Sequence, residues 1–218
     1  MARWPGRLFR AQIVPPATQE ERIALASAAE DLSPHAGYTR ALAIDLLEEL
    51  SASVLFGPHG DAVRQVLEAG CALDEDEARR LATARPAAAD HAYSTAWDRW
   101  LAEQPQGASQ QGTEHAGVVA VSGVGPAPSP IGHGLSVLAH TVDKSARLRG
   151  GTGAHTTDAD GEEVLLDPWH TACAALLDTA MALGAPHLTD DRTRTLLTTA
   201  WTTTYGPAIP PDSDHTPT

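Results

Sequence analysis

Apolar residues recur every three or four positions along most of the first half of this chain, the spacing that places them on one face of an α-helix. The longest run of this kind predicts a helix from residue 38 to residue 54. Its apolar positions are Tyr38, Leu42, Leu46, Leu47, Leu50 and Val54. Shorter helices are predicted over residues 19–31 and 61–70, another after Asp74, and another opened by Pro86.

Capping patterns mark two of these helix starts. Thr18, followed three positions later by Glu21, fits a capping box, in which each side chain bonds a free backbone amide of the first turn. Four acids from Asp74 to Glu77 stand at another helix start, where the positive end of the helix dipole favours them. A divalent-cation loop is the alternative interpretation of these four carboxylates.

The middle of the chain mixes short apolar segments with glycine and proline. Residues 118–121 are suited to a short buried strand, and a Gly/Pro-rich connecting loop follows over residues 122–134. Residues 135–142 fit either a strand or a helix. Further on, Asp160 and Gly161 suit a type I′ turn, so we expect the strands of a β-hairpin on either side of them.

The C-terminal part predicts two helices. Asp167 as a cap and Pro168 at the first helical position begin one that ends at Gly184. Thr189 is expected to cap the last helix, which ends at Gly206. Because the connection is short, the two helices should form a helical hairpin.

Together these elements predict a mainly α fold, α+β overall. The expected parts are an N-terminal arm (1–15), a bundle-like helical region (16–103), a flexible linker (104–116), an α+β region ending in a helical hairpin (117–206) and a disordered tail (207–218). The linker is proposed because residues 104–115 have almost no apolar content.

Composition narrows the classes of function. The chain carries 28 acidic and 15 basic side chains, a formal charge of −13, which disfavours nucleic acid as a partner. No stretch approaches the ~18 consecutive apolar residues that span a bilayer, and the basic start is not followed by an apolar segment typical of an export signal. We therefore expect a soluble, cytoplasmic protein without membrane contact, in which Cys71 and Cys173 are free thiols.

No catalytic or cofactor motif is present, and the sequence leaves open whether the protein is an enzyme. The loop at residues 122–134 lacks the lysine of a Walker loop, and its three prolines remove amides that could cradle phosphate. The best metal-binding candidate is a cluster of His133, His140 and Asp143, whose spacings would align them on one helix face, with His170 as a fourth ligand. No cofactor is expected, apart from a divalent metal if this cluster forms.

Two hypotheses of function follow. The favoured one is a non-catalytic, acidic, helical interaction or accessory protein, whose partner is another protein or a second copy. Its partner-binding candidates are aromatic residues spaced along two helices, Trp97, Trp100, Trp201 and Tyr205; such stripes more often belong to a core. The alternative is a small metal-binding protein or enzyme with a histidine-lined pocket near the Gly/Pro loop.

Overall fold

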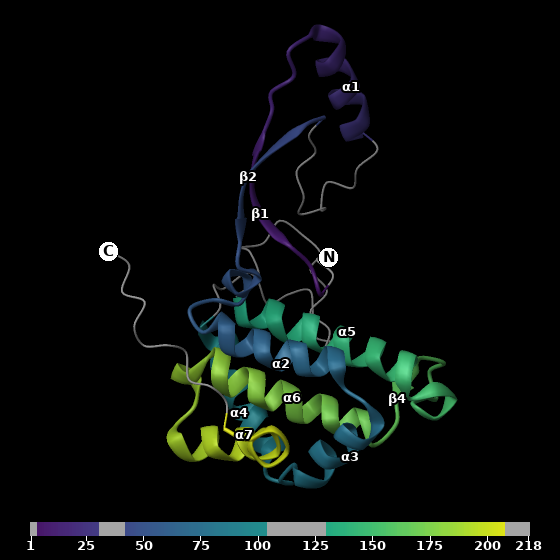
Figure 1. The fold of residues 1–218 in the computed structure, drawn as a ribbon, viewed down its shortest axis with the longest axis vertical. Coiled ribbons are helices and arrows are strands. Elements are labelled where there is room, and N and C mark those ends of the chain that lie inside the picture. The colour runs from purple at the N-terminus through teal and green to yellow at the C-terminus, as the bar shows by residue number, and fades with distance from the viewer. Residues whose placement is uncertain (1–3, 31–41, 104–129, 208–218) are drawn as a thin grey trace.

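The computed structural model describes residues 4–30, 42–103 and 130–207. It has a helical body, a two-stranded ribbon that projects from it, and the first helix at the far end of the ribbon (Figure 1). The mainly α prediction is confirmed. In chain order the α-helices and strands are β1 (Leu8–Ile13), α1 (Gln19–Glu30), β2 (Ile44–Leu50), α2 (Gly60–Ala72), α3 (Glu75–Ala84), α4 (Ala89–Glu103), α5 (Pro130–Arg149), β3 (His155–Thr157), β4 (Glu163–Leu165), α6 (Trp169–Gly184) and α7 (Asp191–Tyr205). Short 3₁₀ turns at Ala52–Phe56, Gly151–Gly153 and Pro186–Leu188 connect some of them.

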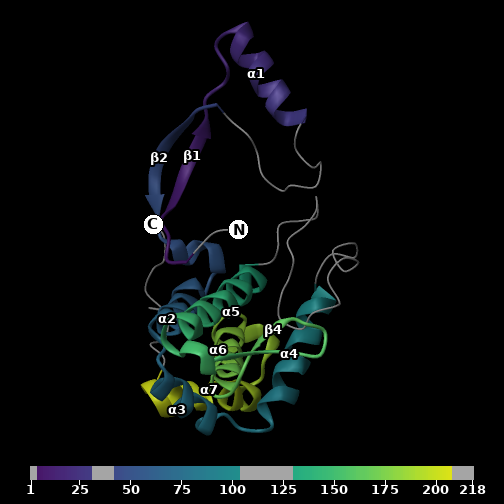
Figure 2. The ribbon, with the colours of Figure 1, turned by 90° about the vertical axis from the view of Figure 1, so that its right-hand side faces the viewer.

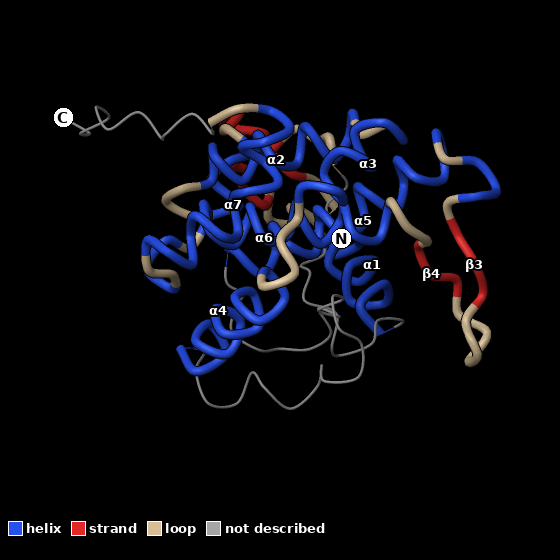
Figure 3. Tube along the Cα trace, turned by 90° about the horizontal axis from the view of Figure 1, so that it is seen from below, coloured by secondary structure: helices blue, strands red, loops and turns tan. Residues whose placement is uncertain are grey.

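Helix α6 lies at the centre of the body and packs against α2, α3, α4, α5 and α7 (Figure 3). Its sequence is apolar on nearly every side, as expected of a helix that has neighbours all round. Leu176 and Met181 are fully buried, and Trp169 is 1% exposed at its first residue. The pairing of α6 with α7 across a short connection agrees with the predicted helical hairpin.

One charged pair lies inside this body. The carboxylate of Asp178 on α6 is 2% exposed and accepts a hydrogen bond of 2.7 Å from Nε of Arg85. The same guanidinium also contacts Asp90, which is largely exposed, at 2.7 Å. Burial raises the pKa of Asp178 to about 6, against the lowering effect of the hydrogen bond from Arg85.

Helix α5 covers residues that the sequence assigns to a loop (130–134) and to a segment of ambiguous type (135–142). The loop prediction is therefore wrong for residues 130–134. Pro130 stands at the first position of the helix, where its missing N–H costs nothing. Gly134 packs against α2: a Cβ there would lie 3.1 Å from Val63 and 3.3 Å from Phe56, so the glycine allows a close approach between helices.

Both predicted capping patterns are present. Glu21 and Thr18 exchange side-chain to backbone hydrogen bonds at the start of α1. Asp74 and Glu77 form a complete capping box at the start of α3, which agrees with the capping interpretation of these acids. The last helix differs by one residue from the prediction, because Asp190, and not Thr189, accepts the hydrogen bond from its first turn.

The two strands of the predicted hairpin are confirmed, but the predicted type I′ turn is wrong, because Asp160 does not have a positive φ and residues 158–162 connect the strands. Strands β3 and β4 pair antiparallel, with His155 opposite Leu165, and Gly161 in the turn has φ +83°. The hairpin lies at one edge of the body (Figure 3). The predicted strand at residues 118–121, the linker at 104–116 and residues 208–218 of the predicted tail lie outside the described residues.

The predicted helix from residue 38 to residue 54 is wrong where the structure describes it. Residues Ile44–Leu50 form strand β2, which pairs with β1 in the segment expected to be an N-terminal arm. Leucines four apart match a helical period, but here a bulge between the two strands breaks the alternation that would have indicated β-structure. Figure 2 shows the two strands rising side by side from the body towards α1.

None of the described helices is both long enough and apolar enough to cross a bilayer.

Candidate functional site

The ribbon of β1 and β2 has one apolar face and one polar face. Antiparallel partners point to the same side of a sheet, and the register pairs Phe9 with Glu49, Ala11 with Leu46 and Ile13 with Ile44. We call the set of five apolar residues in these pairs the apolar face of the ribbon. Its members are Phe9, Ala11, Ile13, Ile44 and Leu46.

The opposite, polar face carries Arg10 opposite Glu48 and Gln12 opposite Asp45. Arg10 donates to the carboxylate of Glu48 at 3.1 Å, so these two charges neutralise each other within the ribbon. Except for the pair of Leu8 and Leu50 at the start of β1, polar side chains occupy one side of the ribbon and mainly apolar ones the other, so the ribbon is amphipathic.

An ion pair between Arg7 and Glu49 borders the apolar face at the end nearer the helical body. Nε of Arg7 donates to Oε1 of Glu49 at 2.8 Å, and the guanidinium lies 4.8 Å from the centroid of the Phe9 ring. The hydrogen bond from Arg7 lowers the pKa of Glu49, and the same bond raises that of Arg7. The apolar face therefore presents no uncompensated charge.

The apolar face is uncovered. Ile13 is 47% exposed, Ile44 56% and Leu46 59%. Leu42, just before β2, and Leu47, the extra residue of the bulge, are 52% and 51% exposed. In the part of the chain that the structure describes, no helix makes an extensive contact with either strand. Large contiguous apolar surfaces are typical of interaction sites, so the ribbon is the candidate functional site of this chain.

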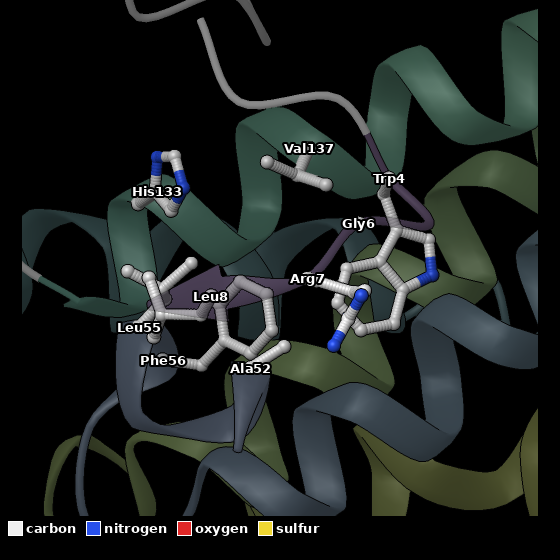
Figure 4. Close-up of a pocket in the computed structure, with 9 residues that line it drawn as sticks. All are labelled: Trp4, Gly6, Arg7, Leu8, Ala52, Leu55, Phe56, His133 and Val137. Atoms are coloured by element: carbon white, nitrogen blue, oxygen red, sulfur yellow. The ribbon is translucent and has the colours of Figure 1, made fainter. Parts of the chain in front are cut away.

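The base of the ribbon is anchored on the body around Phe56, which is 1% exposed (Figure 4). The ring of Trp4 meets it edge-on at 5.8 Å, and the imidazole of His133 stacks on it at 6.1 Å. A cavity of about 200 Å³ lies at this junction. It is smaller than the ~300 Å³ at which ligand pockets begin, so we interpret it as a packing defect between ribbon and body.

The structure does not bring the four metal candidates together. His133 packs on the Phe56 ring, while His140 and His170 are exposed on α5 and α6. Asp143 already bonds Arg147 at 2.9 Å and His155 at 2.8 Å. Partial burial opposes the ionisation of Asp143, but these hydrogen bonds outweigh it and lower its pKa.

Among the described residues, no three His, Cys, Asp or Glu side chains are placed to hold a metal ion. The predicted cluster fails for a physical reason: its one carboxylate is engaged by a guanidinium and by a histidine that the prediction did not include.

The aromatic candidates are largely part of the core. Trp100 is 8% exposed and Trp201 6%. Trp97 and Tyr205 are partly buried and pack against the same core cluster, with Trp97 and Trp100 4.6 Å apart between ring centroids. The exposed apolar surface required by the interaction hypothesis therefore lies on the ribbon, away from these two helices.

Two further groups of polar side chains are candidates for sites of chemistry, the two cysteines and a pair of arginines. Both cysteines are free, as expected, but burial raises the pKa of Cys71 and raises that of Cys173 to about 12, so neither thiol ionises readily. A groove between α3 and α7 contains Arg79 and Arg80, whose guanidinium groups already face acids of their own helix.

Sequence reasoning missed the ribbon, although part of its signal was present. From Phe9 to Ile13 apolar and polar residues alternate strictly, which is the period of a half-buried strand. Five residues are a short signal, and the partner strand lies more than 30 positions away.

No protein-family model, curated protein or solved structure shows a significant match to this chain.

Proposed function

We propose that this protein is a non-catalytic interaction protein, in which a helical body presents an amphipathic β-ribbon that docks on another polypeptide through its apolar face. One observation carries the proposal: Ile13, Ile44 and Leu46 stand side by side on one face of the ribbon, and about half of each is in contact with solvent.

Energetics supports the need for a partner. A two-stranded ribbon is marginally stable in water unless its apolar face packs against something. Burying a leucine-sized side chain contributes roughly 1.5–3 kcal/mol, and about half of this contribution is not realised while the face is exposed. A polypeptide that covers Ile44 and Leu46 would therefore stabilise the ribbon and itself be bound.

Electrostatics narrows the kind of partner. Arg7 and Arg10 are each paired with a glutamate of β2, so these two arginines do not form a basic patch for nucleic acid. An apolar, β-compatible or helical protein surface is the class that fits.

Site-directed photo-cross-linking tests this function. A benzophenone amino acid is placed at position 46, on the apolar face, and in a matched variant at position 12, on the polar face of the same ribbon. On irradiation in the native host, position 46 is expected to yield discrete adducts with a polypeptide identified by mass spectrometry, and position 12 to yield few.

If the two positions gave the same weak, diffuse products, the apolar face would have no resident partner. The proposed docking role would then be wrong.

A further inference from the structure

The size of the apolar face is comparable with what one side of a dimer interface contributes. Ile13, Ile44 and Leu46 are each about half exposed, Ala11 is exposed and Phe9 is half-buried. A half-exposed residue the size of leucine offers about 90 Å², so the five members of the face present roughly 350 Å² of apolar surface per copy. A standard interface buries about 800 Å² per partner, of which some 60% is apolar. The face therefore supplies a large part of the apolar share of one such interface.

The distribution of charge allows the apolar face to pack against the same face of a second copy. In a symmetric interface the same patch lies on both sides, so any unpaired charge on it would meet its own copy. Here Arg7 neutralises Glu49 within each ribbon, and the other members of the face are apolar. Two copies can stack face to face without opposing like charges.

Pairing of two copies through the edges of their β2 strands is disfavoured. If two β2 strands paired antiparallel about Leu47, Asp45 of one copy would stand opposite Glu49 of the other, twice. Like charges directly opposite each other destabilise a sheet. Face-to-face packing of the ribbons avoids this repulsion.

The projection of the ribbon also lowers the repulsion between two acidic chains. A six-residue strand such as β1 is about 20 Å long at ~3.3 Å per residue. If the ribbons pack antiparallel, the two bodies lie at opposite ends, beyond the Debye length of about 8–10 Å at physiological salt. The charges on the two helical bodies are then largely screened from each other.

We propose that the occupant of the apolar face is a second copy of this chain: two ribbons pack face to face and antiparallel, and join two helical bodies into a dimer. This inference rests on the proposed docking function and names its partner.

Sedimentation equilibrium of the full chain tests the dimer. The wild type is expected at twice its monomer mass of 22.9 kDa in the micromolar range. Leu46→Glu places a charge on the apolar face and should weaken dimerisation by at least about 100-fold. Gln12→Lys adds a charge to the polar face, opposite Asp45 of the same ribbon, and should change the dissociation constant by less than about threefold.

A conservative variant separates loss of the dimer from loss of the fold. Leu46→Met keeps the apolar volume and should restore a dimer, while circular dichroism should report the same helix content for all variants, because the ribbon lies outside the helical body. A monomeric wild type, a dimer unaffected by Leu46→Glu, or equal disruption by Gln12→Lys would each overturn the proposal.

The two proposals fail differently. A monomer whose cross-linker at position 46 still captures a different polypeptide overturns the dimer and leaves the docking function standing. A monomeric wild type that gives no adduct at position 46 would overturn both proposals.

Discussion

Replacing Asp178 by asparagine separates two opposing contributions to the stability of the helical body. The carboxylate is almost completely buried, which disfavours its ionised form, and it is bonded by Arg85, which favours that form. With the pKa of Asp178 raised to about 6, the cost of burial exceeds the gain from the ion pair. The ionised carboxylate therefore lowers the stability of the folded state.

The magnitude follows from the change in pKa. A rise from 3.8 to about 6 corresponds to roughly 3 kcal/mol at 1.36 kcal/mol per pH unit. Between these values the folded protein retains a proton that the unfolded chain has lost, so Asp178 makes the free energy of unfolding fall as pH rises through this window. Asparagine cannot titrate. The stability of Asp178→Asn relative to wild type should therefore increase by roughly 2–3 kcal/mol from about pH 4 to about pH 7.

Urea unfolding followed by circular dichroism across this pH range measures the difference, and other titrating groups cancel in it. Asp90→Asn is the matched control, because Asp90 bonds the same guanidinium but is 75% exposed. Its difference from wild type should stay within about 0.5 kcal/mol at every pH. If the relative stability of Asp178→Asn instead fell with rising pH, the ion pair would outweigh burial and the reasoning would be refuted.

Three further substitutions test the packing and the caps. Leu138→Ala on α5 should lower the free energy of unfolding by about 3–4 kcal/mol, because this side chain is fully buried. Leu148 is 70% exposed on the same helix, so Leu148→Ala should lower it by less than about 0.5 kcal/mol. Thermal melts of the two variants measure the difference. Gly60→Ala would place a Cβ 1.8 Å from the carbonyl oxygen of Ser53 and should destabilise the fold by at least about 3 kcal/mol. In Gly153→Ala the added Cβ meets nothing within 4 Å, so this variant should be tolerated. Equal losses of stability in the two variants would contradict this packing. Asp74→Ala should cost about 1 kcal/mol through loss of the capping box, measured by urea unfolding.

Local signals in the sequence were sufficient for most helices and for the hairpin. The capping boxes at Thr18 and Asp74 depend on residues three positions apart, and the turn at Gly161 depends on its own backbone freedom. Such features are encoded within a few residues. They could therefore be predicted without knowledge of the rest of the fold.

The ribbon and α5 depended on distant residues. Strand β2 pairs with a segment more than 30 positions earlier, and the leucine spacing around Leu46 equally fits a helix. Gly134 indicates a loop in isolation, but in the structure it gives α5 room against Val63 and Phe56. The metal prediction failed for a similar reason, since the partner that engages Asp143, His155, lies 12 positions away on a strand.

The position of α6 at the centre of the body has a consequence for the synthesis of the chain. The apolar side of α2 around Val63 and Leu67 is covered by α5 and α6, and Leu176 of α6 follows Val63 by more than 100 residues. At about 5–20 residues per second, this surface leaves the ribosome roughly 5–20 s before its cover exists. During this interval the nascent chain exposes apolar surface of the kind that chaperones bind. The yield of folded protein should therefore depend on how quickly translation reaches α6.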